Sequence, residues 1–150
     1  MKVCIGGTFN IFHKGHKRLI DKAFQTAGTN GVVIIGVTKG KILQKKKFVK
    51  PLEERVKAIN QYLAAKGYDK RALIVPIHDK YGLATEEELD AIIVSPETYA
   101  NAEDINKNRL SNGKKALKII EIPYVLAEDN KPISSTRIYD NIIYENGRKR

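Results

Sequence analysis

The chain has 150 residues, of which 42% are hydrophobic, and a formal net charge of +10 from 27 Lys and Arg against 17 Asp and Glu. These values are typical of one soluble globular domain that can bury a core without disulfides or a structural metal, and they argue against a disordered chain. The excess of positive charge favours anionic partners, either nucleic acid or phosphate-rich small molecules.

Cysteine usage and hydropathy indicate the compartment. The single cysteine, Cys4, lies in an apolar run, which excludes an intramolecular disulfide and any zinc site built on several cysteines. No apolar stretch is near the length of a membrane-spanning helix, which needs about 18 residues. Met1 and Lys2 lead directly into a short apolar segment, which is not the pattern of a signal peptide. We therefore expect a cytoplasmic protein without a membrane partner, with Cys4 in its core.

Apolar segments rich in Val and Ile alternate with amphipathic segments, which predicts strands and helices that alternate along a parallel sheet. The strands are expected at Val3–Ile5, Val32–Val37, Leu73–Ile77, Ala91–Val94 and Leu117–Ile122. Their apolarity is continuous, so helices should cover both faces of the sheet. The predicted architecture is a single doubly wound α/β domain over residues 1–150, with ligands at the carboxyl ends of the strands.

Helices are expected at Lys14–Ala27, Pro51–Lys66, Pro96–Leu110 and Ser134–Glu145. The second has the clearest signals, because Pro51 suits a first helical position and Gly67 can adopt the left-handed cap. Its apolar stripe consists of Val56, Ile59, Tyr62 and Leu63. The last helix should bury Ile138, Ile142 and Ile143, with Gly147 beyond its end.

Two segments at the predicted ligand-binding edge suit phosphate. The first strand ends in Gly6–Asn10, where glycines allow close backbone approach, and the next helix opens with unpaired N–H groups. His13 and His16 lie on one helical turn and could reach one anion. Surface histidines or metal ligands are the alternatives. Metal is the weaker, because His78 is distant in the sequence and no carboxylate accompanies the pair at ligand spacing.

Two further segments could bind anions. Six lysines lie between Lys39 and Lys50, although a charge run is commonly only a solvated surface. Ser134, Ser135 and Thr136 stand at a predicted helix start, where hydroxyls and first-turn N–H groups could bind phosphate. An ordinary helix cap is the alternative there, because Ser and Thr are preferred at that position in any protein.

Together these segments resemble a known family. Gly7-Thr8-Phe9-Asn10 leading into His13-Lys14-Gly15-His16, with Ile133-Ser134-Ser135-Thr136-Arg137 near the other end, is similar to the HxGH and ISSTR signatures of the nucleotidyltransferases. The likeness extends to Leu52–Val56, Val94–Tyr99 and Pro123–Asp129, and is greatest to the archaeal phosphopantetheine adenylyltransferases. The same segments are also similar to the corresponding domain of the eukaryotic bifunctional coenzyme A synthase. Asn10 departs from the pattern, which more often has Asp, so this position either contacts substrate or only shapes the turn.

The resemblance implies a Rossmann-like nucleotidyltransferase fold of the HIGH type. It also implies that ATP and 4'-phosphopantetheine give dephospho-coenzyme A and pyrophosphate, with Mg²⁺ accompanying the nucleotide and no dedicated protein ligands for the metal. The acceptor's phosphate oxygen is already a nucleophile, so we expect direct in-line displacement without a covalent intermediate. Positioning and fixed cationic donors should supply most of the catalysis.

The resemblance assigns roles to particular residues. His16 is expected on the α-phosphate in the transition state, with His13 on the phosphates beside it, and Thr8 should place the attacking phosphate. Lys41 is expected to bridge the two substrates, with Lys39 as the alternative. The other expected nucleotide-binding residues are Gly7, Phe9, Arg109, Ser134, Ser135, Thr136 and Arg137.

Two other functions remain open at this point. Cytidylyltransferases and nicotinamide mononucleotide adenylyltransferases share both signatures, and likeness of fold does not settle the substrate. A nucleic-acid-binding module would account for the charge of +10, but such a sheet usually exposes aromatic side chains for stacking, and this chain has no Trp. We therefore expect no specific nucleic-acid partner.

Overall fold

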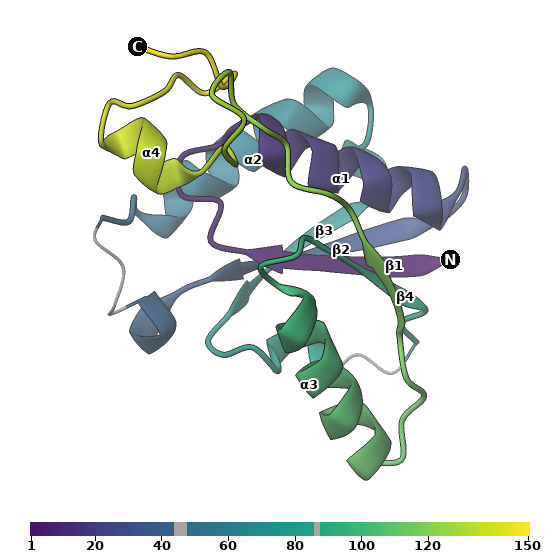
Figure 1. Ribbon diagram of the computed structural model, residues 1–150. Helices are drawn as coiled ribbons and strands as arrows, with labels where there is room; N and C mark the ends of the chain where they lie inside the picture. The colour runs from purple at the N-terminus through teal and green to yellow at the C-terminus, as the bar shows by residue number, and fades with distance from the viewer. Residues whose placement is uncertain (44–47, 86–87) are drawn as a thin grey trace.

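Five parallel strands form one sheet in the part of the chain that the computed structural model describes, residues 1–43, 48–85 and 88–150, and their order is β3-β2-β1-β4-β5 (Figure 1). The strands are β1 (Lys2–Gly7), β2 (Val32–Thr38), β3 (Ala72–Ile77), β4 (Ala91–Val94) and β5 (Lys118–Glu121). The helices are α1 (Lys14–Ala27), α2 (Leu52–Lys66), α3 (Tyr99–Ser111) and α4 (Ser135–Tyr139). Short helical turns are η1 (Gly40–Leu43), η2 (Asp69–Arg71) and η3 (Gly82–Thr85).

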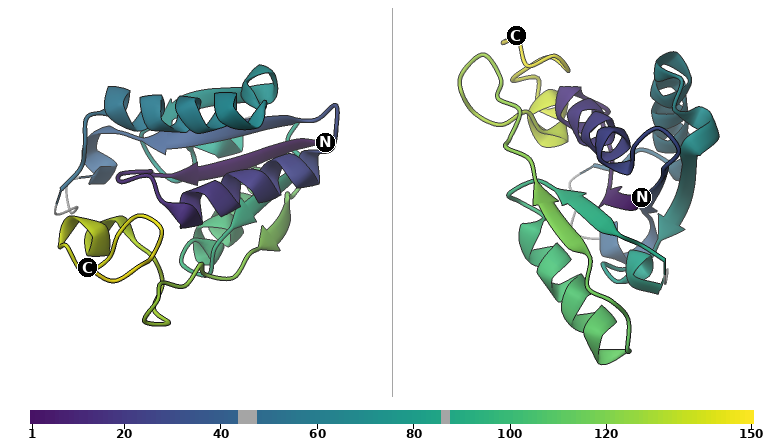
Figure 2. Two further views of the ribbon diagram at one scale, coloured as in Figure 1. Left: turned by 90° about the horizontal axis from the view of Figure 1, so that it is seen from above. Right: turned by 90° about the vertical axis from the view of Figure 1, so that its right-hand side faces the viewer.

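The doubly wound α/β architecture is confirmed. Helices α1 and α2 cover one face of the sheet and α3 covers the other (Figure 2). The chain moves from β1 through β2 to β3 on one side, and then crosses to β4 on the other side of β1. The topological switch point therefore lies between β1 and β4, where a doubly wound sheet binds its ligand.

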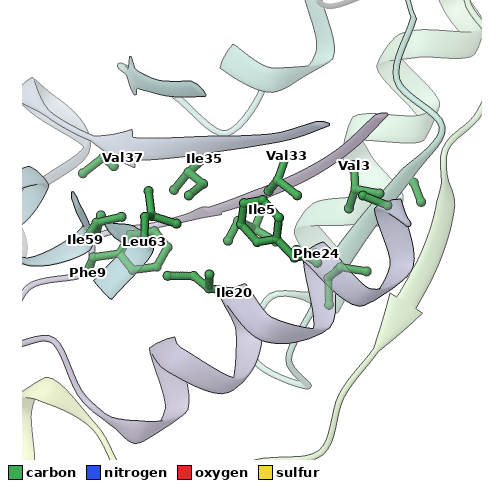
Figure 3. Packing of buried hydrophobic residues seen from close by; sticks show 14 of the residues in the cluster. Val3, Ile5, Phe9, Ile20, Phe24, Val33, Ile35, Val37, Ile59 and Leu63 are labelled. Carbon is green, nitrogen blue, oxygen red and sulfur yellow. The ribbon is translucent and has the colours of Figure 1, made fainter. Parts of the chain in front are cut away.

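Alternate residues of each strand supply two separate cores, which accounts for the continuous apolarity of the strands. Val3, Ile5 and Val33 face Ile20 and Phe24 of α1 in the first core (Figure 3). Cys4 and Ile34 lie in the second core, with residues of α3. The predicted core position of Cys4 is confirmed, and burial raises the pKa of its thiol to about 12. The thiol is therefore neutral and unreactive.

Helix α2 differs from its prediction at two points. Pro51 is the N-cap instead of the first helical residue, while Gly67 adopts the expected left-handed conformation with φ of 74°. Its buried residues are Arg55, Ile59 and Leu63, so an arginine occupies the apolar stripe where Val56 was expected. The physical reason is local, because the guanidinium has backbone carbonyl partners beneath the helix.

The prediction of a helix from Ser134 to Glu145 is wrong. Helix α4 ends at Tyr139, and Asn141 has a φ of 60°, which no helix accommodates. Ile142 is 48% exposed, whereas Ile143 is buried beside Ile138. An antiparallel bridge between residues 143 and 149 closes a turn in which Gly147 has a φ of 86°. Burial of Ile143 and pairing across this turn therefore prevail over helix continuation.

None of the helices in the described ranges is both long and apolar enough to span a membrane. The first and last residues lie at opposite ends of the molecule (Figure 1). The last strand is followed by a largely irregular segment from residue 122 to 150, which packs its apolar residues against Ile11, close to the start of α1. This segment forms one wall of the site at the carboxyl edge of the sheet.

Candidate functional site

A cleft of about 530 Å³ lies at the carboxyl ends of the strands, over the switch point. This volume is within the range of small-molecule sites and is large enough for a nucleotide. Its walls come from the β1–α1 connection, the ends of β2 and β4, the start of α3 and the segment that contains α4. Eight of the predicted site residues line it, namely Gly7, Thr8, Phe9, His13, His16, Ser134, Ser135 and Thr136.

The two histidines cap the start of α1 reciprocally. His13 is the N-cap residue, and its Nδ1 accepts a hydrogen bond of 3.0 Å from the backbone N–H of Gly15. The Nδ1 of His16 accepts a bond of 3.2 Å from the backbone N–H of His13. This is a capping box in which imidazoles replace the usual Ser or Thr and Glu side chains. Because both Nδ1 atoms are acceptors, each ring carries its proton on Nε2.

Both rings are neutral in this environment. Burial lowers the pKa of His13 to about 4. Burial, and then the neighbouring His13, lower the pKa of His16 well below its ordinary value. The rings stack with centroids 3.7 Å apart, and Phe9 and Phe12 lie against His16 at 5.0 and 5.6 Å. The histidines therefore enter the cleft as neutral N–H donors, so positive charge has to come from other residues.

Gly15 is required by this stacking. A Cβ at residue 15 would lie 2.8 Å from Cε1 and 3.0 Å from Nδ1 of His13. Any larger residue would push the imidazole away from the N–H group that it caps. The glycine of the HxGH pattern thus keeps the first histidine in its capping position.

The buried histidines should make stability depend on pH. An unfolded chain protonates His13 near pH 6.5, but the folded protein does so only near 4, so the free energy of unfolding is retained above about pH 6.5 and falls as the pH decreases toward 4. For His13 alone the loss is about 3 kcal/mol, at about 1.4 kcal/mol for each pH unit between the two values. We expect His13→Asn, which keeps a capping oxygen, to reduce this slope in denaturant titrations at pH 7 and pH 5.

His78→Asn is the matched control, because His78 is exposed and outside the cleft lining. This variant should keep the pH dependence of the wild type. An unchanged slope in His13→Asn would show that His13 is not a buried neutral group.

Thr8 is held at the end of β1 by two neighbours. Its Oγ1 lies 3.0 Å from Oγ1 of Thr38, and one hydroxyl donates to the other. Its carbonyl accepts a 3.0 Å bond from Nη1 of Arg55, which also donates to the carbonyl of Thr38 at 2.7 Å. The Nε of Arg55 donates to the carbonyl of Lys50 at 2.8 Å. The buried guanidinium therefore joins the ends of β1 and β2 to the segment before α2.

Phe9 has an unusual backbone. Its φ is 50°, in the left-handed region, which costs a bulky residue about 1 to 2 kcal/mol. Burial of its ring in the first core offsets that cost, since only 1% of the residue is exposed. Strain of this kind gathers at functional sites, where the surrounding structure maintains it. Here it turns the chain from β1 toward α1 beneath the cleft.

The hydroxyls of the ISSTR segment are already engaged in the protein. Ser134 Oγ accepts from the backbone N–H of Arg137, so the N-cap interpretation is confirmed for Ser134. Ser135 Oγ accepts from the N–H of Ile11 at 3.0 Å and donates to the carbonyl of Ile11 at 3.1 Å. Thr136 is exposed in the cleft. Ser135 therefore fastens α4 to the β1–α1 connection.

The predicted lysines lie beside the cleft. Lys41 is exposed in η1, and its neighbours Ile42 and Leu43 line the cleft, whereas Lys41 itself does not. The backbone N–H of Lys39 donates to Ile77 at the end of β3. Residues 44–47 of the lysine run, including Lys45, Lys46 and Lys47, lie outside the described residues.

The two predicted arginines do not face the cleft. Ile105 of α3 lines the cleft, but Arg109, one turn further along the helix, does not. Arg109 is fully buried, and its Nε donates to the carbonyl of Lys115 at 2.7 Å. The expectation that it holds a phosphate in the crevice is wrong. Arg137 turns back to form an ion pair with Asp129 and donates to the carbonyl of Pro132 at 2.9 Å.

Sequence reasoning missed three residues of the site. Arg55 could have been found, because it precedes Ile59 and Leu63 at helical spacing and therefore belongs to the buried stripe. Lys80 lines the cleft and forms an ion pair with Asp104 at 2.9 Å, and its position three residues after the end of β3 could have indicated it. Thr38 ends β2 at the same edge. Their shared signal is the position of a polar side chain at a carboxyl strand end or on a buried helix face.

Comparison with known proteins agrees with this geometry. Residues 4–141 match the family model described as cytidylyltransferase-like. The phosphopantetheine adenylyltransferase of Methanosarcina barkeri is 47% identical, covering 98% of this chain and 91% of that protein. The enzyme of the same description from Methanosarcina mazei is 45% identical, covering 98% and 96%. A crystal structure of an Archaeoglobus fulgidus protein of unknown function is 34% identical with a TM-score of 0.71, covering 82% of this chain and 98% of that one.

Proposed function

We propose that this chain, which belongs to the phosphopantetheine adenylyltransferase family of cytidylyltransferase-like proteins, transfers the adenylyl group of ATP to 4'-phosphopantetheine and releases pyrophosphate. The observation that carries the proposal is identity of 47% to such an enzyme over 98% of the chain. The cleft adds support, because it unites Thr8 and the two HxGH histidines with the ISSTR hydroxyls over the switch point.

The chemistry requires positioning more than activation. An oxygen of the acceptor's phosphate forms a bond to the α-phosphorus of ATP, and the bond from that phosphorus to the oxygen bridging the α- and β-phosphates breaks. Pyrophosphate leaves with the electron pair, and the products are dephospho-coenzyme A and pyrophosphate. The attacking oxygen is already ionised, so no general base is needed. In-line placement of the two phosphates then supplies a large part of the rate.

The histidines suit the α-phosphate. Their Nε2–H groups are donors because both Nδ1 atoms already accept backbone N–H groups. A neutral donor held rigidly in a partly desolvated cleft stabilises charge that develops in the transition state without reorganising. We assign His16 to the α-phosphate and His13 to the phosphates beside it. Thr8, held by Thr38 and Arg55, is assigned to the attacking phosphate.

Positive charge is assigned to the lysines at the end of β2. Lys41 keeps the proposed role of bridging the two substrates, because it stands in η1 between cleft-lining segments and its exposed ammonium is on a flexible stem. Thr136 and the first turn of α4 are assigned to the β- and γ-phosphates. The ion pair of Arg137 with Asp129 gives that arginine a supporting role, in which it shapes the segment that precedes Ser134.

Magnesium is assigned to the nucleotide instead of to a protein cage. Mg²⁺ prefers oxygen ligands and usually retains waters while binding substrate phosphates. Glu97 is the carboxylate among the described lining residues, and no three His, Cys, Asp or Glu side chains cluster anywhere in the described part of the chain. These residues do not form a dedicated metal site, so no step of the reaction is assigned to one.

A matrix of substrates tests the function. The purified chain would be incubated with ATP or CTP and with 4'-phosphopantetheine, nicotinamide mononucleotide or an alcohol phosphate, and pyrophosphate release would be measured. We expect release with ATP and 4'-phosphopantetheine, and dephospho-coenzyme A as the second product. Release confined to CTP with an alcohol phosphate would assign the chain to the cytidylyltransferases, and release with nicotinamide mononucleotide alone would also contradict the proposal.

A further inference from the structure

We propose that Phe48 and Tyr139 form an aromatic clasp that positions α4 at the nucleotide end of the cleft, and that Asn10 anchors this clasp. The inference rests on the proposed function and adds positioning residues to it. Neither aromatic residue belongs to the HxGH or ISSTR segments, and both line the cleft.

The clasp joins two walls of the cleft. Phe48 comes from the segment before α2 and Tyr139 is the last residue of α4. Their rings stack with centroids 4.7 Å apart and planes inclined by 10°. The residues are 40% and 44% exposed, so the stack lies at the mouth of the cleft and not in the core. Figures 1 and 2 show α4 beside the chain that leads into α2.

Asn10 holds the Phe48 side of the clasp with both atoms of its amide. Its Nδ2 donates to the carbonyl of Phe48 at 2.5 Å, and its Oδ1 accepts from the N–H of Lys50 at 2.8 Å. A carboxylate could accept from Lys50 but could not donate to Phe48. Asn instead of Asp at this position is therefore matched to the backbone of the segment, which accounts for the departure of this chain from the signature.

The contacts form a closed ring of interactions among three segments of the chain. Ile11, next to Asn10, exchanges two hydrogen bonds with Ser135 at the start of α4. Ser135 and Tyr139 are four residues apart and share one helix face. The ring thus runs from Asn10 and Ile11 through α4 to Tyr139, across to Phe48 and back to Asn10. It ties the β1–α1 connection, the segment before α2 and the ISSTR helix into one unit.

This ring matters because α4 has only five residues. So short a helix is marginal on its own and takes its orientation from tertiary contacts. Without the clasp, α4 would occupy its binding-competent orientation for a smaller fraction of the time. The apparent dissociation constant for ATP would rise in inverse proportion to that fraction. Beyond the contribution of its buried area, a stacked aromatic pair changes an equilibrium constant by a factor of about two to ten.

A double-mutant cycle tests the clasp. Phe48→Ala and Tyr139→Ala should each raise KM and the dissociation constant for ATP by about two- to tenfold, with a much smaller change in kcat. The double variant should bind ATP no more weakly than the single variant with the lower affinity, because either change removes the same contact. Tyr139→Phe should bind ATP more tightly than Tyr139→Ala, because it keeps the stacked ring. Tyr144→Ala is the matched control, since Tyr144 is an exposed tyrosine of the same segment that does not line the cleft.

A readout independent of turnover comes from tryptophan fluorescence. The chain has no Trp, so Phe48→Trp introduces a single reporter at the clasp. We expect its emission to shift to longer wavelength when Tyr139→Ala or Asn10→Asp is added, because the indole becomes more solvated, and to stay unchanged with Tyr144→Ala.

The outcomes separate the two proposals. The clasp would be overturned if Phe48→Ala and Tyr139→Ala had independent, multiplicative effects on ATP affinity. It would also be overturned if the emission of Phe48→Trp did not change when Tyr139→Ala is added, even in a fully active enzyme. Absence of pyrophosphate release with every substrate pair would overturn the proposed function, while coupled ATP affinities and a shifted emission would still support the clasp.

Discussion

His16→Gln is expected to lower kcat for pyrophosphate release by about 100- to 1000-fold, with little change in KM for ATP. The imidazole Nε2–H contacts the α-phosphate chiefly as charge develops. A glutamine whose amide oxygen caps the helix has N–H groups, but it lacks the stacked ring that holds the donor in place, and loss of one preorganised donor costs about 2.7 to 4 kcal/mol of transition-state stabilisation. Glutamine at this third helical position can still accept the N–H of His13, as glutamine does in an ordinary capping box. The fall in kcat would therefore occur without loss of helix capping.

Two variants complete this test. His16→Ala removes the capping acceptor as well, so it should lose thermal stability in addition to kcat, and the difference between the two variants measures the cap. His78→Ala should leave both quantities unchanged, because His78 is exposed and outside the cleft. Near-normal kcat with only a raised KM in His16→Gln would contradict the assigned role.

Arg55→Met is expected to destabilise the protein by about 3 kcal/mol. Methionine replaces the apolar stem, but the carbonyls of Thr8, Thr38 and Lys50 lose their donors, and each unsatisfied buried group costs about 1 to 3 kcal/mol. For a chain of this size the loss corresponds to a fall of about 6 to 12 °C in Tm. Calorimetry at pH 7 would measure it.

Lys57→Met is the matched control, because Lys57 is an exposed cation on the same helix and its replacement should change Tm little. Arg55→Lys should be intermediate, since one ammonium cannot reproduce the fork that reaches three carbonyls. Equal Tm values for the Arg55→Met and Lys57→Met variants would show that the carbonyls are satisfied without the guanidinium.

Elements with strong local signals could be predicted from the amino-acid sequence alone. Runs of Val and Ile predicted five parallel strands, with Ala91–Val94 at the observed bounds, and Lys14–Ala27 also matched. The HxGH residues were placed correctly at the cleft, because a strand end and the following helix start are adjacent in any doubly wound sheet. For these features the neighbours along the chain supply the forces that decide the structure.

Features that depend on residues distant in the sequence could be seen only in the folded structure. Helix α4 stops at Tyr139 because Ile143 is buried beside Ile11, a residue from the other end of the chain. Arg109 is buried at the end of α3, where its Nε donates to the carbonyl of Lys115, while Arg55 is buried because carbonyls from two strand ends and the segment before α2 meet beneath it. Asn10, Phe48 and Tyr139 meet only after three segments converge. Charge and helical spacing limit where a side chain can lie. Its burial and its partners depend on contacts between segments far apart in the sequence, and a local sequence pattern contains no information about those contacts.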